Sequence, residues 1–165
     1  MKLLQKGETD LRIKIRDGIS IAGIGREDMR ILYQNYRLKR LPWDLPFDLE
    51  PKEVLSQAQE LISRKYPYAW SVRDGAVPLM MVFASILWDA ICLDSPIFSP
   101  KASKRRIFEG SVTLIDQLRK EAPLLICGTD KQKSFLEKLN DRKLIRRVGT
   151  LNRTTGHYLF QARIP

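Results

Sequence analysis

The sequence predicts one mixed α/β domain with a mostly antiparallel sheet and a β-α-β crossover in its second half. Two pairs of β-patterned segments each surround an Asp-Gly pair, which is a strong signal for a hairpin. The second half of the chain alternates strand and helix patterns, as a crossover requires. The chain has 165 residues, of which 44% are hydrophobic, so we expect a single packed domain over residues 1–165.

The first half of the chain is predicted to form two hairpins separated by two helices. The hairpins turn at Asp17-Gly18 and at Asp74-Gly75, and prolines break any helix between the two helical patterns. Asp48 followed by Pro51 has the order typical of a capped helix start, and Pro67 ends that helix. The expected elements are strands over 11–16 and 19–24, a helix over 26–40, a loop over 41–47, the helix capped by Asp48, and strands over 68–73, 76–86 and 88–98.

The second half is predicted to alternate helices and strands. Segment 76–86 is almost continuously apolar, which is typical of a central strand that is covered on both faces. Thr129 followed by Gln132 is a capping-box pattern at a helix start. The expected elements are a basic loop over 101–106, a helix that ends near residue 121, a strand over 124–127, a helix through residue 139, and strands over 145–151 and 157–164.

The charge of the chain is uneven. Lys and Arg number 29 against 19 Asp and Glu, which gives a net charge of +10. Residues 99–165 hold 15 basic and 6 acidic residues, whereas residues 1–98 hold 14 and 13. The basic half is therefore expected to meet an anionic partner, either a phosphorylated cofactor or a nucleic acid.

Several classes of protein and site are not expected. The first ten residues lack the apolar region of a secretory signal, and the longest apolar stretch, 76–88, is too short to span a bilayer, so we expect a cytoplasmic protein without a membrane partner. The single histidine, His157, makes a histidine-based metal site improbable, and no metal is expected. Cys92 and Cys127 form no C-x-x-C pair and lie in apolar runs, which favours buried, inert thiols in a reducing compartment.

Two local motifs and the order of the elements carry a family resemblance. Phe98-Ser99-Pro100 ends a predicted strand, and Arg105 and Gly110 have the spacing of the first and last positions of an Arg-x-x-Gly-x-Gly loop before a helix. This segment resembles the coenzyme-binding motif of the GNAT N-acetyltransferase superfamily, and FLEKL at 135–139 is similar to a second motif of that family. The resemblance covers residues 19–164. It implies a GNAT-like mixed sheet with helices on both faces and one extra N-terminal strand.

The resemblance implies a site for acetyl-CoA, in which backbone N–H groups at a helix N-terminus hold the pyrophosphate. Phe108 occupies the middle glycine position of the loop motif. Leu136 stands where many members have a tyrosine that protonates the departing thiolate. Gly110 either shapes the phosphate cradle or sits at a helix start. The cofactor-binding residues implied by the motif are Phe98, Lys104, Arg105, Arg106, Ile107, Gly110 and Ser111.

The resemblance implies an enzyme in which an amine attacks the thioester of acetyl-CoA directly. A backbone N–H near the end of strand 88–98 would hold the oxyanion, and either Asp89 or Asp94 would accept the proton of the amine. Phe108 and Leu136 equally suit a catalytically silent GNAT-like protein. The chain is similar to the short, basic GNAT-like proteins of tailed bacteriophages, which implies virion proteins as partners and the host cytoplasm or the virion as its location. A third hypothesis is a nucleic-acid-binding module that uses the basic C-terminal half, including the basic cluster within 138–147.

Overall fold

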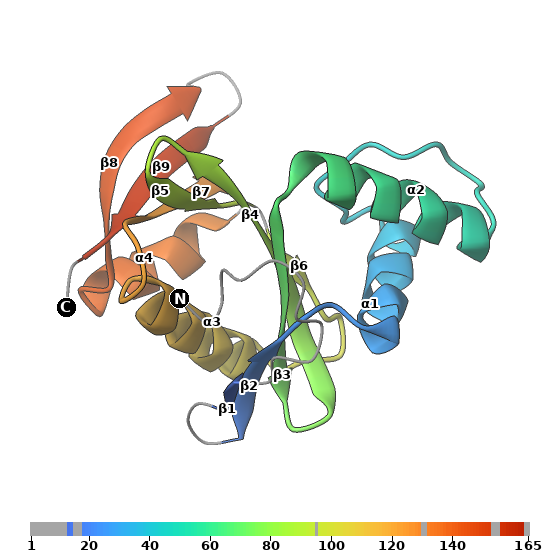
Figure 1. The fold of residues 1–165 in the computed structure, drawn as a ribbon, viewed down its shortest axis with the longest axis horizontal. Coiled ribbons are helices and arrows are strands. Elements are labelled where there is room, and N and C mark those ends of the chain that lie inside the picture. Colours follow the sequence, from blue (N-terminus) through green and yellow to red (C-terminus); the bar gives the residue numbers. More distant parts are fainter. Residues whose placement is uncertain (1–12, 15–17, 95, 130–131, 153–155, 164–165) are drawn as a thin grey trace.

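The computed structural model describes the chain except for residues 1–12, 15–17, 95, 130–131, 153–155 and 164–165 (Figure 1). Its strands form one nine-stranded sheet in the order β1-β2-β3-β4-β5-β7-β9-β8, with β6 paired to β4. The strands are β1 (Ile13–Lys14), β2 (Ile19–Ala22), β3 (Tyr68–Asp74), β4 (Val77–Leu87), β5 (Ala90–Leu93), β6 (Ile97–Phe98), β7 (Leu124–Thr129), β8 (Ile145–Asn152) and β9 (His157–Ala162), and the helices are α1 (Arg26–Arg37), α2 (Pro51–Lys65), α3 (Lys104–Leu118) and α4 (Lys133–Asp141).

The pairing of the strands confirms the predicted fold class. Among the described strands, β5 and β7 form the parallel pair, and every other pair is antiparallel. Helix α3 makes the connection between these two strands, so β5-α3-β7 is the predicted β-α-β crossover. Strand β1 pairs with β2 at one edge of the sheet and is the additional N-terminal strand.

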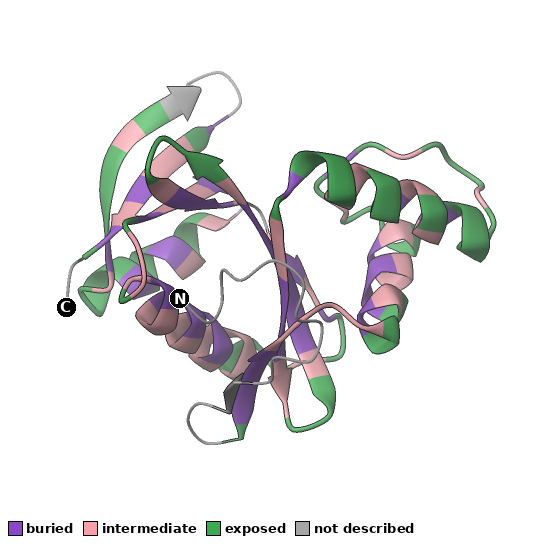
Figure 2. Ribbon diagram, viewed as in Figure 1, coloured by how far each residue is buried: buried purple, intermediate pink, exposed green. Residues whose placement is uncertain are grey.

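Helices cover both faces of the sheet, and β4 lies between them. Helices α1 and α2 pack on one face, and α3 and α4 pack on the other (Figures 1 and 2). Alternate residues of β4 point to opposite faces. Met80 and Val82 join the cluster beneath α3 and α4, whereas Met81 and Phe83 join the cluster beneath α1 and α2. The prediction of a central strand covered on both faces is therefore confirmed.

Helix α1 is fixed to β3 by a buried carboxylate. Asp28, in the first turn of α1, accepts hydrogen bonds from the Gly25 N–H at 2.7 Å and from the Ser71 hydroxyl at 2.6 Å. The Arg73 guanidinium donates to the same carboxylate at 2.7 Å. The helix ends at Arg37 and not at residue 40, because Lys39 has a φ of +53° that no α-helix can continue.

Helix α2 starts two residues later than predicted. Asp48 does not cap it, because Asp48 lies in a preceding turn with a φ of +62°. Glu50 takes the N-cap position, and its backbone N–H donates to the Glu53 carboxylate at 2.9 Å. Pro51 occupies the first turn as predicted, where its missing N–H costs no hydrogen bond.

The predicted strand over 88–98 is interrupted. Trp88 and Asp89 form the turn between β4 and β5, and the rest divides into β5 and β6. Both pieces pair with β4, with Leu93 opposite Ala84 and Ile97 opposite Met81. The chain advances by four residues from Leu93 to Ile97, whereas the paired stretch of β4 from Ala84 to Met81 spans three. The connection from Leu93 to Ile97 is therefore one residue longer than the stretch of β4 opposite it, which is the count of a β-bulge.

Other boundaries differ from the predictions by a few residues. The basic loop predicted over 101–106 ends at Ser103, whose hydroxyl caps α3 by accepting from the Arg106 N–H at 3.2 Å. The Gln132 side chain accepts from the Thr129 N–H at 3.0 Å, as the capping-box pattern predicts, although α4 begins at Lys133. Most of segment 11–16 and the end of segment 157–164 lie outside the described residues.

Candidate functional site

Strands β5 and β7 separate at the middle of the sheet. They pair in parallel from Ile91 with Leu124 to Leu93 with Ile126. Beyond that point β7 follows β9, whereas the N–H of Asp94 donates to the Phe83 carbonyl at 3.0 Å and the chain stays with β4. The two neighbouring strands therefore diverge after Leu93 and Ile126. We refer to this opening as the β5–β7 gap.

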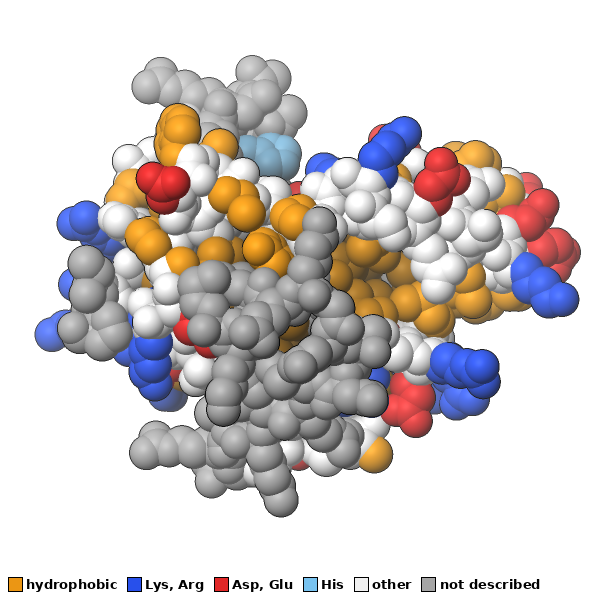
Figure 3. All heavy atoms as spheres, viewed as in Figure 1, with side chains coloured by type: hydrophobic (Ala, Val, Ile, Leu, Met, Phe, Trp, Pro, Cys, Tyr) orange, Lys and Arg blue, Asp and Glu red, His pale blue; other side chains and the backbone are white. Residues whose placement is uncertain are grey.

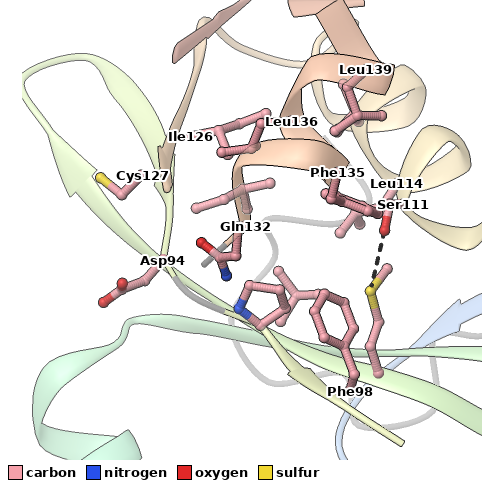
Figure 4. A pocket seen from close by; sticks show the side chains of 15 residues that line it. Asp94, Phe98, Ser111, Leu114, Ile126, Cys127, Gln132, Phe135, Leu136 and Leu139 are labelled. Carbon is pink, nitrogen blue, oxygen red and sulfur yellow. Dashed lines mark hydrogen bonds between the residues drawn. The ribbon is translucent and has the colours of Figure 1, made fainter. Parts of the chain in front are cut away.

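A small apolar pocket of about 50 Å³ lies at the β5–β7 gap. Leu93 and Ile126 line it from the sheet, and α3 and α4 close its other side. Asp94 and Cys127 lie at one side of the pocket, and Gln132 extends into it from the start of α4 (Figure 4). The pocket therefore offers apolar walls with a carboxylate, a thiol and an amide at its edge.

A basic groove continues from this pocket between α3 and α4. The groove has a volume of about 700 Å³ and shares Phe98, Gln132 and Phe135 with the apolar pocket. Four cationic side chains line it, all of them exposed. They are Lys104 and Arg105 from α3, Lys138 from α4 and Arg142 just after α4. The combined cavity is apolar at the gap and positively charged at the helix ends.

The structure brings together five of the seven predicted cofactor-binding residues. They divide between the apolar pocket and the basic groove. The residues concerned are Phe98, Lys104, Arg105, Ile107 and Ser111. The Ser111 hydroxyl is buried and donates to the Ile107 carbonyl at 2.9 Å.

Arg106 and Gly110 lie apart from the combined cavity. The Arg106 guanidinium donates to both oxygens of Asp74 at 2.7 Å, which lowers the pKa of that carboxyl. A Cβ atom on Gly110 would lie 3.0 Å from Val72 Cγ1 and 3.2 Å from Leu79 Cδ1. The glycine thus allows α3 to pack closely on the sheet, which favours the structural alternative for this residue.

Phe108 lies in the basic groove and does not line the apolar pocket. Its ring packs edge-on against Phe135, with 5.7 Å between centroids, and the Arg142 guanidinium lies 5.3 Å from its centroid. The side chain that replaces the motif's glycine therefore forms a wall of the groove. Leu136 is buried against Gly128 of β7 at the pocket, so an aliphatic side chain occupies the family's tyrosine position.

A tyrosine from the other face of the sheet holds the Asp94 carboxylate. Tyr66, which follows α2, donates its hydroxyl hydrogen to Asp94 Oδ2 at 2.5 Å. Lys65 Nζ lies 3.6 Å from the same oxygen, and the Trp43 indole N–H donates to the Tyr66 hydroxyl at 3.4 Å. Burial raises the pKa of Tyr66, and so does its hydrogen bond to Asp94. The phenol therefore stays protonated at neutral pH.

The two carboxylates predicted as alternative bases lie at opposite ends of β5. Asp94 follows the strand and lines the pocket, whereas Asp89 precedes it in an exposed turn beside Trp88. The geometry therefore favours Asp94. The role of Tyr66 could not be predicted from the sequence, because 28 residues separate it from Asp94 and no local pattern marks the pair.

The basic cluster within 138–147 divides between two surfaces. Lys138 and Arg142 face the groove. Arg146 and Arg147 lie on β8 and contact β9. Arg146 donates to Gln161 at 2.9 Å, and the Arg147 guanidinium lies 4.2 Å from the centroid of the Tyr158 ring. In the view of Figure 3, hydrophobic side chains gather near the middle of the molecule, and Lys and Arg lie toward its edges.

Comparisons with known proteins match the fold and not the sequence. No family model and no curated protein matches the chain. The fold is similar to a probable GNAT-family acetyltransferase from Chromobacterium violaceum, with a TM-score of 0.69 and 14% identity over 95% of this chain and 92% of that one. A GNAT-family acetyltransferase from Bacillus anthracis gives a TM-score of 0.66 with 12% identity over 92% and 97% of the two chains.

A third similar structure contains coenzyme A. It is RimL, a ribosomal L7/L12 alpha-N-protein acetyltransferase in complex with coenzyme A, with a TM-score of 0.67 and 10% identity over 93% of this chain and 98% of that one. At these identities the likeness establishes the fold. The chain has the GNAT fold that the motifs predicted.

Two further observations concern membranes and metals. Among the helices of the described residues, none is both long enough and apolar enough to cross a membrane. In the described part of the chain, no three His, Cys, Asp or Glu side chains gather in a way that could hold a metal ion.

Proposed function

We propose that this protein binds a coenzyme A thioester and transfers its acyl group to an amine. The observation that carries the proposal is the continuity between the apolar pocket at the β5–β7 gap and the basic groove between α3 and α4. A ligand that fits both must be apolar at one end and polyanionic at the other. Coenzyme A thioesters have that character, and coenzyme A is the ligand of the GNAT-fold neighbour RimL.

The residues of the combined cavity suit such a ligand. Lys104, Arg105, Lys138 and Arg142 supply positive charge for phosphate groups. The N-terminal turn of α3 opens toward the same groove and adds the positive end of a helix dipole. The apolar walls of the pocket suit an acyl chain and exclude water from the thioester.

A coenzyme A thioester supplies an acyl group that is activated for attack by an amine. The amine must lose a proton to act as the nucleophile, and Asp94 is the carboxylate at the pocket that can accept it, directly or through water. Tyr66 holds Asp94 by its hydrogen bond and so acts as a positioning residue. Leu136 has no acidic proton, so the departing thiolate receives none from this position.

Calorimetry with acetyl-CoA tests the binding step. The wild type is expected to bind saturably, and Arg105→Glu to bind at least about tenfold more weakly, because a charge-assisted contact to phosphate is worth about 1.5–3 kcal/mol. Lys52→Glu is the matched control, since it makes the same charge change on the exposed first turn of α2. Absence of heat at millimolar acetyl-CoA would contradict the proposal.

A second candidate function is polyanion binding by a catalytically silent GNAT-fold protein. Leu136 at the tyrosine position and the exposed Arg146 and Arg147 on β8 favour it. If nucleic acid binds to this surface, the protein should retard it in a gel at low salt. The logarithm of the association constant should then fall linearly with the logarithm of the salt concentration. Release of free coenzyme A thiol from acetyl-CoA in the presence of a panel of amines would contradict a protein without catalytic activity. Phage origin, virion partners and location in a host cytoplasm remain predictions.

A further inference from the structure

The two cysteines of the chain lie on β5 and β7 where the β5–β7 gap begins. Cys92 lies in β5 opposite Leu125, and Cys127 is two residues further along β7, so both side chains lie on the same face of the sheet. Their Sγ atoms are 3.2 Å apart, and both thiols are free. Cys127 also lines the apolar pocket (Figure 4). Cys92 is buried as predicted, whereas Cys127 is partly exposed, and the prediction of inert thiols did not anticipate their contact.

We propose that Cys92 and Cys127 form a reversible disulfide that links β5 to β7 at the edge of the apolar pocket and so controls entry to it. A disulfide requires sulfur atoms about 2 Å apart, so the two Sγ atoms, now 3.2 Å apart, must approach each other by about 1 Å. Cys127 is the first residue of β7 beyond the last pair, Leu93 with Ile126. The bond would therefore form where the two strands begin to separate.

The contact also prepares the pair for oxidation. The hydrogen bond with Cys127 lowers the pKa of Cys92, and the same contact raises the pKa of Cys127. The Cys92 thiol therefore loses its proton before the Cys127 thiol. The thiolate is the nucleophile in thiol–disulfide exchange, and a neighbouring thiol can then complete the reaction.

The oxidant is a small-molecule disulfide. The first cysteine thiolate attacks one of its sulfur atoms, forms a mixed disulfide and expels one thiolate. The second cysteine, once deprotonated, attacks the protein sulfur of the mixed disulfide and expels the other thiolate. Two cysteine thiols are thus oxidised to one disulfide, and the small-molecule disulfide is reduced to two thiols.

The effect on the pocket rests on the proposed coenzyme site. When the two cysteines are reduced, no covalent bond limits the separation of β5 and β7 beyond Leu93 and Ile126. Oxidised, Cys92 in the paired part of β5 holds Cys127 just beyond it, which narrows the β5–β7 gap at its start. We therefore expect the oxidised protein to admit an acyl-CoA thioester less well than the reduced protein.

Disulfide formation is tested without any coenzyme. The full chain is incubated with oxidised glutathione, and its thiols are counted after denaturation. The wild type should lose both of its 2 cysteine thiols, fall in mass by about 2 Da, and recover under dithiothreitol. Cys92→Ser and Cys127→Ser should each gain one glutathione instead. Two free thiols, two glutathione adducts or a linked dimer in the wild type would overturn the pair.

Control of entry is tested by calorimetry with acetyl-CoA on reduced and oxidised protein. Oxidation should weaken binding by about tenfold or more in the wild type and should not change the affinity of a Cys92→Ser/Cys127→Ser double variant. If serine at buried Cys92 prevents folding, the Cys92→Ala/Cys127→Ala pair replaces it. Equal affinities in the two redox states would overturn the control. Binding in neither state would overturn the coenzyme site while the disulfide stands.

Discussion

The Asp94 carboxylate is held in place by side chains from outside its own strand. Tyr66 donates to it at 2.5 Å and itself accepts from the Trp43 indole at 3.4 Å. Both aromatic residues belong to the cluster beneath α1 and α2, whereas Asp94 also lines the pocket that α3 and α4 close. The proposed base therefore connects the two faces of the sheet.

Removal of the Tyr66 hydroxyl should weaken both folding and turnover. Tyr66→Phe leaves the Trp43 N–H and Asp94 without this partner, and a partly buried hydrogen bond to a charged group contributes about 1–3 kcal/mol. We expect urea denaturation to show a loss of that size. Turnover should fall while the affinity for acetyl-CoA stays unchanged, because Tyr66 itself lines neither the pocket nor the groove.

Tyr33→Phe is the matched control for this prediction. Tyr33 lies in α1 on the same face of the sheet, where its ring stacks on Tyr36 at 6.2 Å between centroids. The substitution should leave turnover unchanged. Equal turnover of Tyr66→Phe and the wild type would show that Tyr66 does not position the base.

At the level of elements, an ion pair connects the start of α3 to the end of β3. Arg106 in the first turn of α3 contacts Asp74, the last residue of β3, and also the Glu109 carboxylate. These contacts orient the same helix end that faces the basic groove. Arg106 therefore fixes the position of this end of α3 without lining the groove itself.

The Arg106–Asp74 contact should make stability depend on pH in the acid range. Hydrogen bonding to Arg106 lowers the pKa of Asp74 from its ordinary value of 3.8, so the contact stabilises the fold above that value and is lost as the pH falls through the lowered pKa. Arg106→Gln should lower Tm by about 1–4 °C at pH 7, and the difference should shrink below about pH 4. Thermal melts between pH 2 and pH 7 measure this.

Asp74→Asn is the companion variant. It removes the same contact from the other side but leaves the contact between Arg106 and Glu109, so the double variant should lose little more than Arg106→Gln alone. Additive losses in Tm would show that the two side chains act independently.

The elements that could be predicted from sequence are those with a local signal. The hairpin between β3 and β4 turns at Asp74-Gly75, where Gly75 has a φ of +57°, a conformation that glycine adopts freely. The interruption after Leu93 was not predicted, because segment 94–96 lies within a run that reads as one strand. Its extra residue is defined by the partner β4, which no local pattern reveals.

The same distinction holds for the candidate site. Phe98, Lys104 and Arg105 were predicted because they belong to one continuous motif, and they lie together in the combined cavity. The contact between Cys92 and Cys127 joins residues 35 apart through the register of two parallel strands. A single sequence contains no signal for that register.

For the whole molecule, the sheet divides the interior into two clusters, and strand β4 contributes to both. Trp70 lies in the cluster beneath α3 and α4, and Trp43 lies in the cluster beneath α1 and α2. Because β4 supplies side chains to both clusters, neither can lose its packing alone. We expect the molecule to unfold in one cooperative transition.

Phe83→Ala tests that cooperativity. Phe83 is fully buried beneath α1 and α2 and packs against Trp43 at 5.2 Å between ring centroids. Its truncation should cost about 3–5 kcal/mol, and circular dichroism and tryptophan fluorescence should report the same lowered urea midpoint. Separate midpoints would mean that the two clusters unfold independently.

Phe47→Ala is the control for size and chemistry. Phe47 is 74% exposed in the loop before α2, so the same truncation there removes little buried surface. Its effect should stay within about 0.5 kcal/mol. A large effect at Phe47 would show that aromatic truncation alone, and not burial, accounts for the loss at Phe83.

The extra residue between Leu93 and Ile97 inverts the side-chain alternation along the strand that follows it. Leu93 packs beneath α3 and α4, yet Ile97, an even number of positions later, packs beneath α1 and α2. In an uninterrupted strand these two residues would share a face. Deletion of any one residue from segment 94–96 would turn Ile97 out of one core and Phe98 away from the other. The packing of both cores therefore fixes the number of residues in this segment. Substitutions within it keep the register, whereas deletions do not.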